Sequence, residues 1–257
     1  MGAMAAKAVA LRGDRVIMAC RNMAKAEVVR RSIRDVIPDA DISIARLNLS
    51  DMSSVRSFAA GLEGVRIDAL FNNAGIINRN FTTTADGFEN TLATNYLGPY
   101  LLTRLITGNM PENANIVNMV SLTCRFGKVD GSLFSRGPES FSQLGTYSDT
   151  KLALLLFSVA LAGRMPGVHV NVADPGVVNS NMISMGRWFD PLADILFRPL
   201  CKSPEKGVAP ALRALEYNGS LEYFAGRRHS RIHERYLGHT MVEELWNRTS
   251  DILKIDR

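Results

Sequence analysis

The sequence predicts an α/β fold in which one doubly wound parallel sheet carries helices on both faces. Short apolar runs alternate with helical stretches of about ten residues or more, a pattern typical of βαβ units. The chain has 257 residues, of which 46% are hydrophobic and 21% charged, so it is long enough for one large core. We therefore predict a single domain over residues 1–257, with ligands bound at the carboxyl ends of its strands.

Hydrophobic periodicity predicts each element in turn. Helices are expected at residues 3–11, 23–36, 52–62, 92–105 and 147–164. Strands are expected at residues 16–19, 42–47, 69–71, 115–120 and 168–173. Beyond them, Ser203 followed by Pro204 predicts the start of another helix, with Ser203 as its N-cap.

The composition excludes several classes of protein. No apolar window approaches the length of about eighteen residues that a transmembrane helix needs, and a secretory leader is not evident. The three widely spaced cysteines, Cys20, Cys124 and Cys201, argue against a disulfide framework or a zinc site and favour reduced thiols, so we expect a cytoplasmic location. The net charge of +5 is dispersed and does not predict nucleic-acid binding. Its densest run, residues 227–235, is interpreted as a solvated surface, with a phosphate or partner patch as the alternative.

A tyrosine and a lysine lie four residues apart in Tyr147-Ser148-Asp149-Thr150-Lys151. On a helix such residues share one face, with Cβ atoms about 5–6 Å apart. An ammonium beside a phenol lowers a pKa that is about 10 when unperturbed. The pair therefore predicts a tyrosine that transfers protons near neutral pH. An amphipathic helix with an incidental Tyr and Lys is the alternative.

Two further polar residues are candidates for the same site, one at the end of an expected strand and one inside an expected helix. Ser121 follows the strand at 115–120, where its hydroxyl would donate to a substrate oxygen. Asn95 lies inside the helix at 92–105, where its amide either satisfies the core or holds a proton-relaying water. Small residues in Asn73-Ala74-Gly75 would let a flat ligand approach the backbone, although an ordinary strand-to-helix turn fits as well.

These residues resemble the motifs of the short-chain dehydrogenase/reductase family, and the resemblance extends over residues 2–224. Residues 86–89, 147–153 and 174–178 are most similar to its retinol-dehydrogenase-like branch. The resemblance implies a Rossmann-like NAD(P)-binding domain that transfers a hydride between a nicotinamide cofactor and a carbonyl or alcohol. The matching residues, in order, are Asn73-Ala74-Gly75, Asn95, Ser121, Tyr147, Lys151 and Pro175-Gly176.

The resemblance also implies roles. Tyr147 would be the acid in reduction and the base in oxidation, and Lys151 would lower its pKa and bind the nicotinamide ribose. Ser121 would orient the substrate oxygen, and Asn95 would hold the relay water. No metal is implied. The expected cofactor-binding residues are Gly2, Arg21, Asn48, Leu49, Asn73, Ala74, Gly75, Tyr147, Lys151, Pro175, Gly176 and Val178.

The end of the strand at 16–19 favours NADP(H) over NAD(H). An NAD-preferring site usually places an acidic residue there for the ribose hydroxyls. Cys20 and Arg21 stand there instead, and a guanidinium matches a 2′-phosphate. Asn48 occupies the place of a family Asp that faces the adenine amino group, and its amide oxygen would still accept a hydrogen bond.

The start of the sequence departs from the family pattern. The family begins with a strand and a glycine-rich turn, and Met1-Gly2 resembles only the last two positions of that turn. The absent strand is central, between the strands at Val16 and Ala69, so two edges would be left unpaired. Either the natural chain begins earlier, which the intact catalytic set favours, or the protein is shortened and then unable to bind a dinucleotide.

Large apolar residues follow Pro175-Gly176 and predict a lipophilic lid, with a packed helix pair or a membrane-contacting surface as alternatives. They are Met182, Ile183, Met185, Trp188, Phe189, Leu192, Ile195, Leu196 and Phe197. We thus predict an NADP(H)-dependent enzyme for a hydrophobic carbonyl or alcohol. A non-catalytic, shortened relative that binds a partner is the alternative. Helices 92–105 and 152–161 correspond to the family's dimerisation faces, which implies a homodimer or homotetramer.

Overall fold

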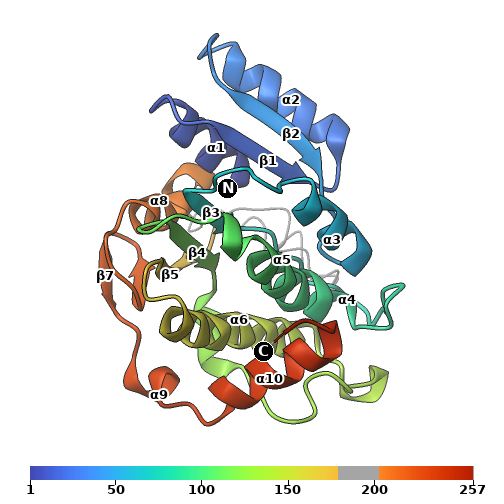
Figure 1. The fold of residues 1–257 in the computed structure, drawn as a ribbon. Helices are drawn as coiled ribbons and strands as arrows, with labels where there is room; N and C mark the ends of the chain where they lie inside the picture. The colour runs from blue at the N-terminus through green and yellow to red at the C-terminus, as the bar shows by residue number, and fades with distance from the viewer. Residues whose placement is uncertain (179–202, 257) are drawn as a thin grey trace, which may run out of the picture.

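The structure, a computed structural model, describes residues 1–178 and 203–256 (Figure 1). Every helix and strand expected from periodicity is present, with bounds close to those predicted. The first half contains α1 (Gly2–Ala10), β1 (Val16–Cys20), α2 (Met23–Arg34), β2 (Ile42–Arg46), α3 (Met52–Ala60) and β3 (Ala69–Asn72). Next come α4 (Asn90–Leu92), the π-helical turn η1 (Ala93–Leu97), α5 (Gly98–Ile106), η2 (Thr107–Asn109), β4 (Asn115–Met119), η3 (Leu122–Phe126), η4 (Pro138–Ser140), α6 (Gln143–Arg164) and β5 (His169–Asp174). The last elements are α8 (Pro204–Leu215), β6 (Glu222–Ala225), β7 (Arg228–Arg231), α9 (Glu234–Leu237) and α10 (Met241–Leu253).

The strands form two sheets. β1 and β2 pair in parallel, and the larger sheet has the order β3-β4-β5-β6-β7. All neighbours in the larger sheet are parallel except β7, which runs antiparallel to β6. The predicted α/β class with a mainly parallel sheet is confirmed. β7 was not foreseen, because its four residues are all exposed and show no apolar alternation.

The two sheets are separated between β1 and β3, where the resemblance described above implies a further strand. Among the described strands, β1 pairs only with β2, and β3 pairs only with β4. Each of β1 and β3 therefore has one edge without a partner strand among them. Ala69 is exposed and Leu70 and Phe71 are half-buried, although a strand inside such a sheet is normally covered on both faces. The two unpaired edges expected from the sequence are therefore present in the part of the chain that the structure describes.

Helices cover both faces of the larger sheet, as predicted. α6 packs against β4 and β5 on one face, and α8 packs against the same strands on the other (Figure 1). The main apolar cluster lies under α5 and α6 and includes Tyr96, Leu101, Ile116 and Leu155. No helix within residues 1–178 and 203–256 has the length and apolar character needed to cross a membrane.

The C-terminal helix α10 packs on α6 (Figure 1). It is also hydrogen-bonded to α5. Tyr100 and Ser250 share a hydrogen bond of 2.8 Å. Trp246 lies against the guanidinium groups of Arg104 and Arg164, each 4.3 Å from its ring centroid. α10 thus covers part of the helix faces that the predicted homodimer or homotetramer would use, and that assembly stays a prediction.

Candidate active site

Three of the predicted catalytic side chains meet at the carboxyl end of β4. Ser121 directly follows that strand, and α6 carries Tyr147 and Lys151 toward it. Tyr147 is hydrogen-bonded to Ser121, and the Lys151 Nζ lies 5.7 Å from the centroid of the Tyr147 ring. Only 9% of Tyr147 and 2% of Lys151 is exposed. The helical spacing therefore places the phenol and the ammonium together, as predicted.

Burial governs the ionisation of both groups. It raises the pKa of Tyr147, although the hydrogen bond with Ser121 lowers it in part. Burial also lowers the pKa of Lys151 to about 8, against the opposing charge of Asp174. The Lys151 Nζ donates to the Met119 carbonyl at 2.8 Å. The lowering of the Tyr147 pKa expected from Lys151 is therefore not found here, because desolvation of the phenol is the larger effect.

Asn95 lies in η1, where the helix expected at residues 92–105 loosens into a π-helical turn. Its Oδ1 accepts from the Ile76 N–H at 2.8 Å, and its Nδ2 donates to the Ile76 carbonyl at 2.9 Å and to Thr150 Oγ1 at 3.2 Å. The amide thus ties the loop after β3 to α6. Such turns are frequent at functional sites, but periodicity cannot detect them. The relay-water role of Asn95 stays a prediction.

A cavity of about 420 Å³ lies at the carboxyl ends of β1, β2 and β3. It adjoins the catalytic group, because a Cβ added at Gly75 would lie 3.3 Å from the Lys151 Nζ. Glycine at position 75 is therefore what allows the lysine to lie against the cavity wall. Met1, Thr94 and Pro204 also line the cavity, without having been predicted to do so. The predicted cofactor-binding residues in its lining are Arg21, Asn48, Leu49, Asn73, Ala74, Gly75 and Val178.

Two features of this cavity fit a nicotinamide dinucleotide. The Oδ1 of Asn73 is buried and has no hydrogen-bond partner among the described residues, so it is available to a ligand. α1 begins at Gly2 without a side-chain cap, and Met1 lines the cavity. The free N–H groups of a helix N-terminus favour phosphate. A Cβ at Gly2 would lie 3.0 Å from the Asn73 Nδ2, so these two predicted residues adjoin.

Arg21 and Asn48 differ in how much of their hydrogen-bonding capacity is used. No hydrogen bond or ion pair joins the exposed Arg21 to another residue that the structure describes. The Asn48 Oδ1 accepts from Ser50 Oγ at 2.9 Å. Arg21 is thus fully available to a ligand, whereas Asn48 would share its oxygen. Of the remaining predicted residues, Pro175 and Gly176 form the turn that leads from β5 to Val178.

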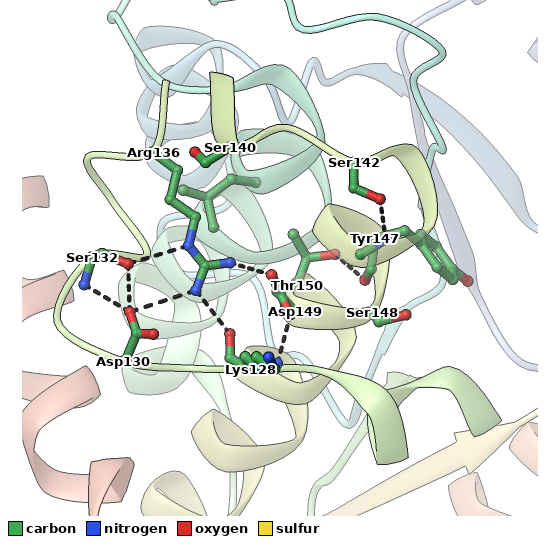
Figure 2. A network of polar contacts seen from close by, with 12 residues as sticks. Lys128, Asp130, Ser132, Arg136, Ser140, Ser142, Tyr147, Ser148, Asp149 and Thr150 are labelled. Atoms are coloured by element: carbon green, nitrogen blue, oxygen red, sulfur yellow. Dashed lines mark hydrogen bonds and ion pairs between the residues drawn. The ribbon is translucent and has the colours of Figure 1, made fainter. Parts of the chain in front are cut away.

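A network of polar contacts ties the loop before α6 to that helix (Figure 2). Arg136 forms an ion pair with Asp149, two residues after Tyr147, and donates to the Lys128 carbonyl at 3.2 Å. Asp149 Oδ1 also accepts from the Lys128 N–H at 2.5 Å. Burial raises the pKa of Asp149, while Lys128 and Arg136 lower it. Asp149, which lies between Tyr147 and Lys151 in the sequence motif, therefore holds the loop that contains Lys128 and Arg136 against α6.

Replacing Asp149 with asparagine is expected to lower the free energy of unfolding by about 1–3 kcal/mol, because a partly buried guanidinium loses its charged partner. Urea denaturation would measure this loss, and hydrogen exchange in residues 128–136 should become faster. Asp130→Asn is the matched control, since its largely exposed carboxylate lies 3.5 Å from the same arginine. An equal loss of stability in both variants would contradict the role given to Asp149.

Several exposed apolar side chains belong to the segments that carry Ser121 and Tyr147 or that follow β5. Leu122 and Phe126 belong to η3, directly after Ser121, and are 46% and 77% exposed. Leu144 lies one turn before Tyr147, and Val177 follows the turn after β5. The predicted apolar lid at residues 182–197 lies outside the described residues.

Some residues at this site were hardly indicated by the sequence. Asp174 and Tyr223 come from two neighbouring strands, and the Tyr223 hydroxyl donates to the Asp174 carboxylate at 2.9 Å. The position of Asp174 at the end of a strand is the one signal that would have marked it. Arg136 lies in a loop without periodicity, so nothing in the sequence linked it to Asp149.

The chain is similar to known short-chain dehydrogenases in both sequence and structure. Residues 1–187 match the family described as short chain dehydrogenase. The chain is 33% identical over 268 residues to retinol dehydrogenase 11 of Homo sapiens, which covers 98% of this chain and 82% of the relative. It is 32% identical over 266 residues to retinol dehydrogenase 12 of Bos taurus, with coverage of 99% and 83%.

Solved structures agree with these sequence relatives. A crystal structure of an uncharacterised protein from Mycobacterium paratuberculosis has a TM-score of 0.78 and 28% identity, covering 100% of this chain and 91% of that chain. A short chain dehydrogenase/reductase family protein has a TM-score of 0.63 and 25% identity, with coverage of 87% and 90%. The fold of this chain therefore has counterparts among solved structures.

Proposed function

Since this chain belongs to the short-chain dehydrogenase/reductase family of oxidoreductases, we propose that it transfers a hydride between NADP(H) and a hydrophobic carbonyl or alcohol. The observation that carries the proposal is the meeting of Ser121, Tyr147 and Lys151 next to Gly75, which lines the cavity. A proton donor, a second hydroxyl and a buried cation beside one ligand site form the set that carbonyl reduction requires.

The three side chains divide the proton chemistry. In reduction, the neutral Tyr147 hydroxyl donates its proton to the substrate oxygen, and in oxidation the phenolate accepts it. Ser121, which is hydrogen-bonded to Tyr147, would donate to the same oxygen and hold it in place. Lys151 supplies positive charge that stabilises the phenolate as the proton leaves. The bound nicotinamide cofactor supplies or accepts the hydride.

The cavity residues have separable tasks in holding this cofactor. The N-terminus of α1 at Gly2 suits the pyrophosphate, and the unpartnered Asn73 Oδ1 suits a polar group of the nucleotide. Asn48 would meet the adenine. Arg21, free of partners among the described residues, would bind a 2′-phosphate and is the reason for preferring NADP(H).

Arg21→Ala is expected to raise the Kd for NADPH by about 5- to 150-fold, the effect of losing a charged hydrogen bond. The Kd for NADH should change little, because NADH has no 2′-phosphate. Fluorescence titration with both cofactors would measure the two constants. Arg15→Ala, another exposed arginine near β1, serves as the control. Equal losses for NADPH and NADH would refute the role of Arg21 in cofactor choice.

A hydrophobic substrate is supported by the exposed apolar side chains around the catalytic group, among them Phe126 and Leu144. Exposed apolar side chains near polar catalytic groups are typical of a site that binds an apolar ligand. The names of the relatives point the same way, since both are retinol dehydrogenases. At equal concentration, retinal and long-chain aldehydes should therefore be reduced at a higher rate than short polar aldehydes.

The first test is an NADPH titration of the full chain, followed by fluorescence and by the shift in melting temperature. Micromolar binding with a raised melting temperature would support the proposal, and the aldehyde panel would follow. A folded chain that binds neither cofactor would refute it and favour a partner-binding protein, which the family comparisons do not favour. The cytoplasmic location and the homodimer or homotetramer are separate predictions that this test leaves open.

A further inference from the structure

Asp174 ends β5 at the same edge of the sheet as Ser121, and only 5% of it is exposed. Its Oδ2 accepts from the Tyr223 hydroxyl at 2.9 Å, and its Oδ1 accepts from the Gly176 N–H at 2.8 Å. Gly176 has a φ of 70°, in the left-handed region that favours glycine. Each carboxylate oxygen therefore has a fixed partner, and the side chain is held in one orientation at the site.

The buried ammonium of Lys151 lies close to the same strand end. It donates to the Met119 carbonyl at 2.8 Å, and Met119 pairs with Ala173, the residue before Asp174. No ion pair joins Lys151 to an acid among the residues that the structure describes. A buried charge without a counter-charge is strongly unfavourable. Asp174 is the acid whose charge raises the pKa of Lys151 against burial, and it raises the pKa of Tyr147 as well.

We propose that Asp174 is a positioning residue for proton transfer, whose fixed carboxylate at the end of β5 is the counter-charge of the buried Lys151 ammonium beside Tyr147. This inference rests on the proposed function, since it concerns the two central groups of that site. A neutral phenol is the proton donor in carbonyl reduction, so Asp174 favours the reductive direction near neutral pH.

The other titratable groups around Asp174 do not replace its charge. Burial and Asp174 raise the pKa of Tyr223 far above its usual value, so that phenol stays neutral. Burial raises the pKa of the Cys124 thiol, which is likewise neutral near pH 7. Arg125 on η3 and Arg235 on α9 are the cations whose charge reaches Cys124. α8, on the other face of β5, presents buried small and apolar side chains.

The direction of the expected effect follows from the sign of the charge. Removing a negative charge makes it easier for the Tyr147 phenol to lose its proton and for the Lys151 ammonium to do so as well. Both ionisations should therefore occur at lower pH in Asp174→Asn. Carbonyl reduction, which needs the neutral phenol, should begin to fall at lower pH in this variant than in the wild type.

The test uses the full chain with lysine labelled with ¹³C at Cε, and the Lys151 signal is assigned with Lys151→Met. The wild-type signal should titrate near pH 8, and Asp174→Asn should lower this midpoint by about one pH unit. Asp174→Ser is a second neutral variant, in case the amide disturbs the turn. Tyr223→Phe removes the hydrogen bond but keeps the carboxylate, so its midpoint should match the wild type.

An unchanged Lys151 midpoint in a folded neutral variant would overturn the proposal, and so would an equal shift in Tyr223→Phe. The pH profile of NADPH-dependent aldehyde reduction provides the second readout, since a merely structural role would lower activity without moving the profile. A wild type without turnover would contradict the proposed function, whereas the lysine titration would still decide the role of Asp174.

Discussion

Tyr147→Phe is expected to lower kcat for aldehyde reduction by about 10²- to 10⁴-fold, the usual contribution of a positioned general acid. Phenylalanine keeps the ring that packs beside Lys151 but lacks the hydroxyl that is hydrogen-bonded to Ser121. The fold and the cofactor cavity should therefore survive the change. Absorbance of NADPH at saturating aldehyde would measure kcat, and fluorescence titration would measure the Kd for NADPH.

The control for this variant is Tyr217→Phe, a half-buried tyrosine that packs against Phe224 and is not in the catalytic group. Its kcat should stay within about twofold of the wild type, as for most substitutions away from a site. A Tyr147→Phe protein that binds NADPH normally and keeps more than a tenth of wild-type kcat would show that another group donates the proton. Ser121 would then be the first residue to test.

The sequence could predict those parts of the fold and site that depend on local pattern. Alternating apolar runs located β1 to β5, and the four-residue spacing placed Tyr147 and Lys151 on one helix face. Residues after strand ends, such as Arg21 and Asn73, were found in the cavity lining because parallel strands present their carboxyl ends at one edge.

What the sequence could not predict depends on contacts between distant segments. The Tyr223–Asp174 hydrogen bond spans 49 residues, and the Tyr100–Ser250 bond spans 150. Neither leaves a periodic trace in the chain. The positions of β7 and α10 could not be predicted for the same reason, because β7 pairs with β6 and α10 packs on α6.

The ionisation of Tyr147 shows a second limit. The residue spacing identified a neighbouring lysine and predicted a lowered pKa, whereas the enclosed phenol has a raised one. Burial is a property of the assembled core and acts on every charged form within it. A motif therefore predicts which groups meet, but the surrounding structure decides their protonation.

Lys151→Met is expected to abolish efficient turnover and yet to stabilise the protein at pH 7. The folded protein holds this ammonium in a site where its pKa falls from 10.5 to about 8. At about 1.4 kcal/mol per pKa unit, this burial destabilises the wild type by roughly 3 kcal/mol at pH 7. Loss of the hydrogen bond to the Met119 carbonyl offsets about 1 kcal/mol of the gain. The variant should therefore be more stable by roughly 2 kcal/mol in urea denaturation.

The pH dependence distinguishes this cause from better packing. Below pH 8 lysine is charged in both the folded and unfolded wild type, so the full destabilisation is present. Between pH 8 and 10.5 the unfolded chain binds more protons than the folded one, so wild-type stability rises with pH through this window. The advantage of Lys151→Met should thus shrink toward zero by about pH 10.5. Lys151→Arg, which remains charged throughout, should show no gain at any pH. A Lys151→Met protein that is less stable than the wild type at pH 7 would mean that the ammonium is well compensated in the fold, and that the electrostatic cost inferred for this site is wrong.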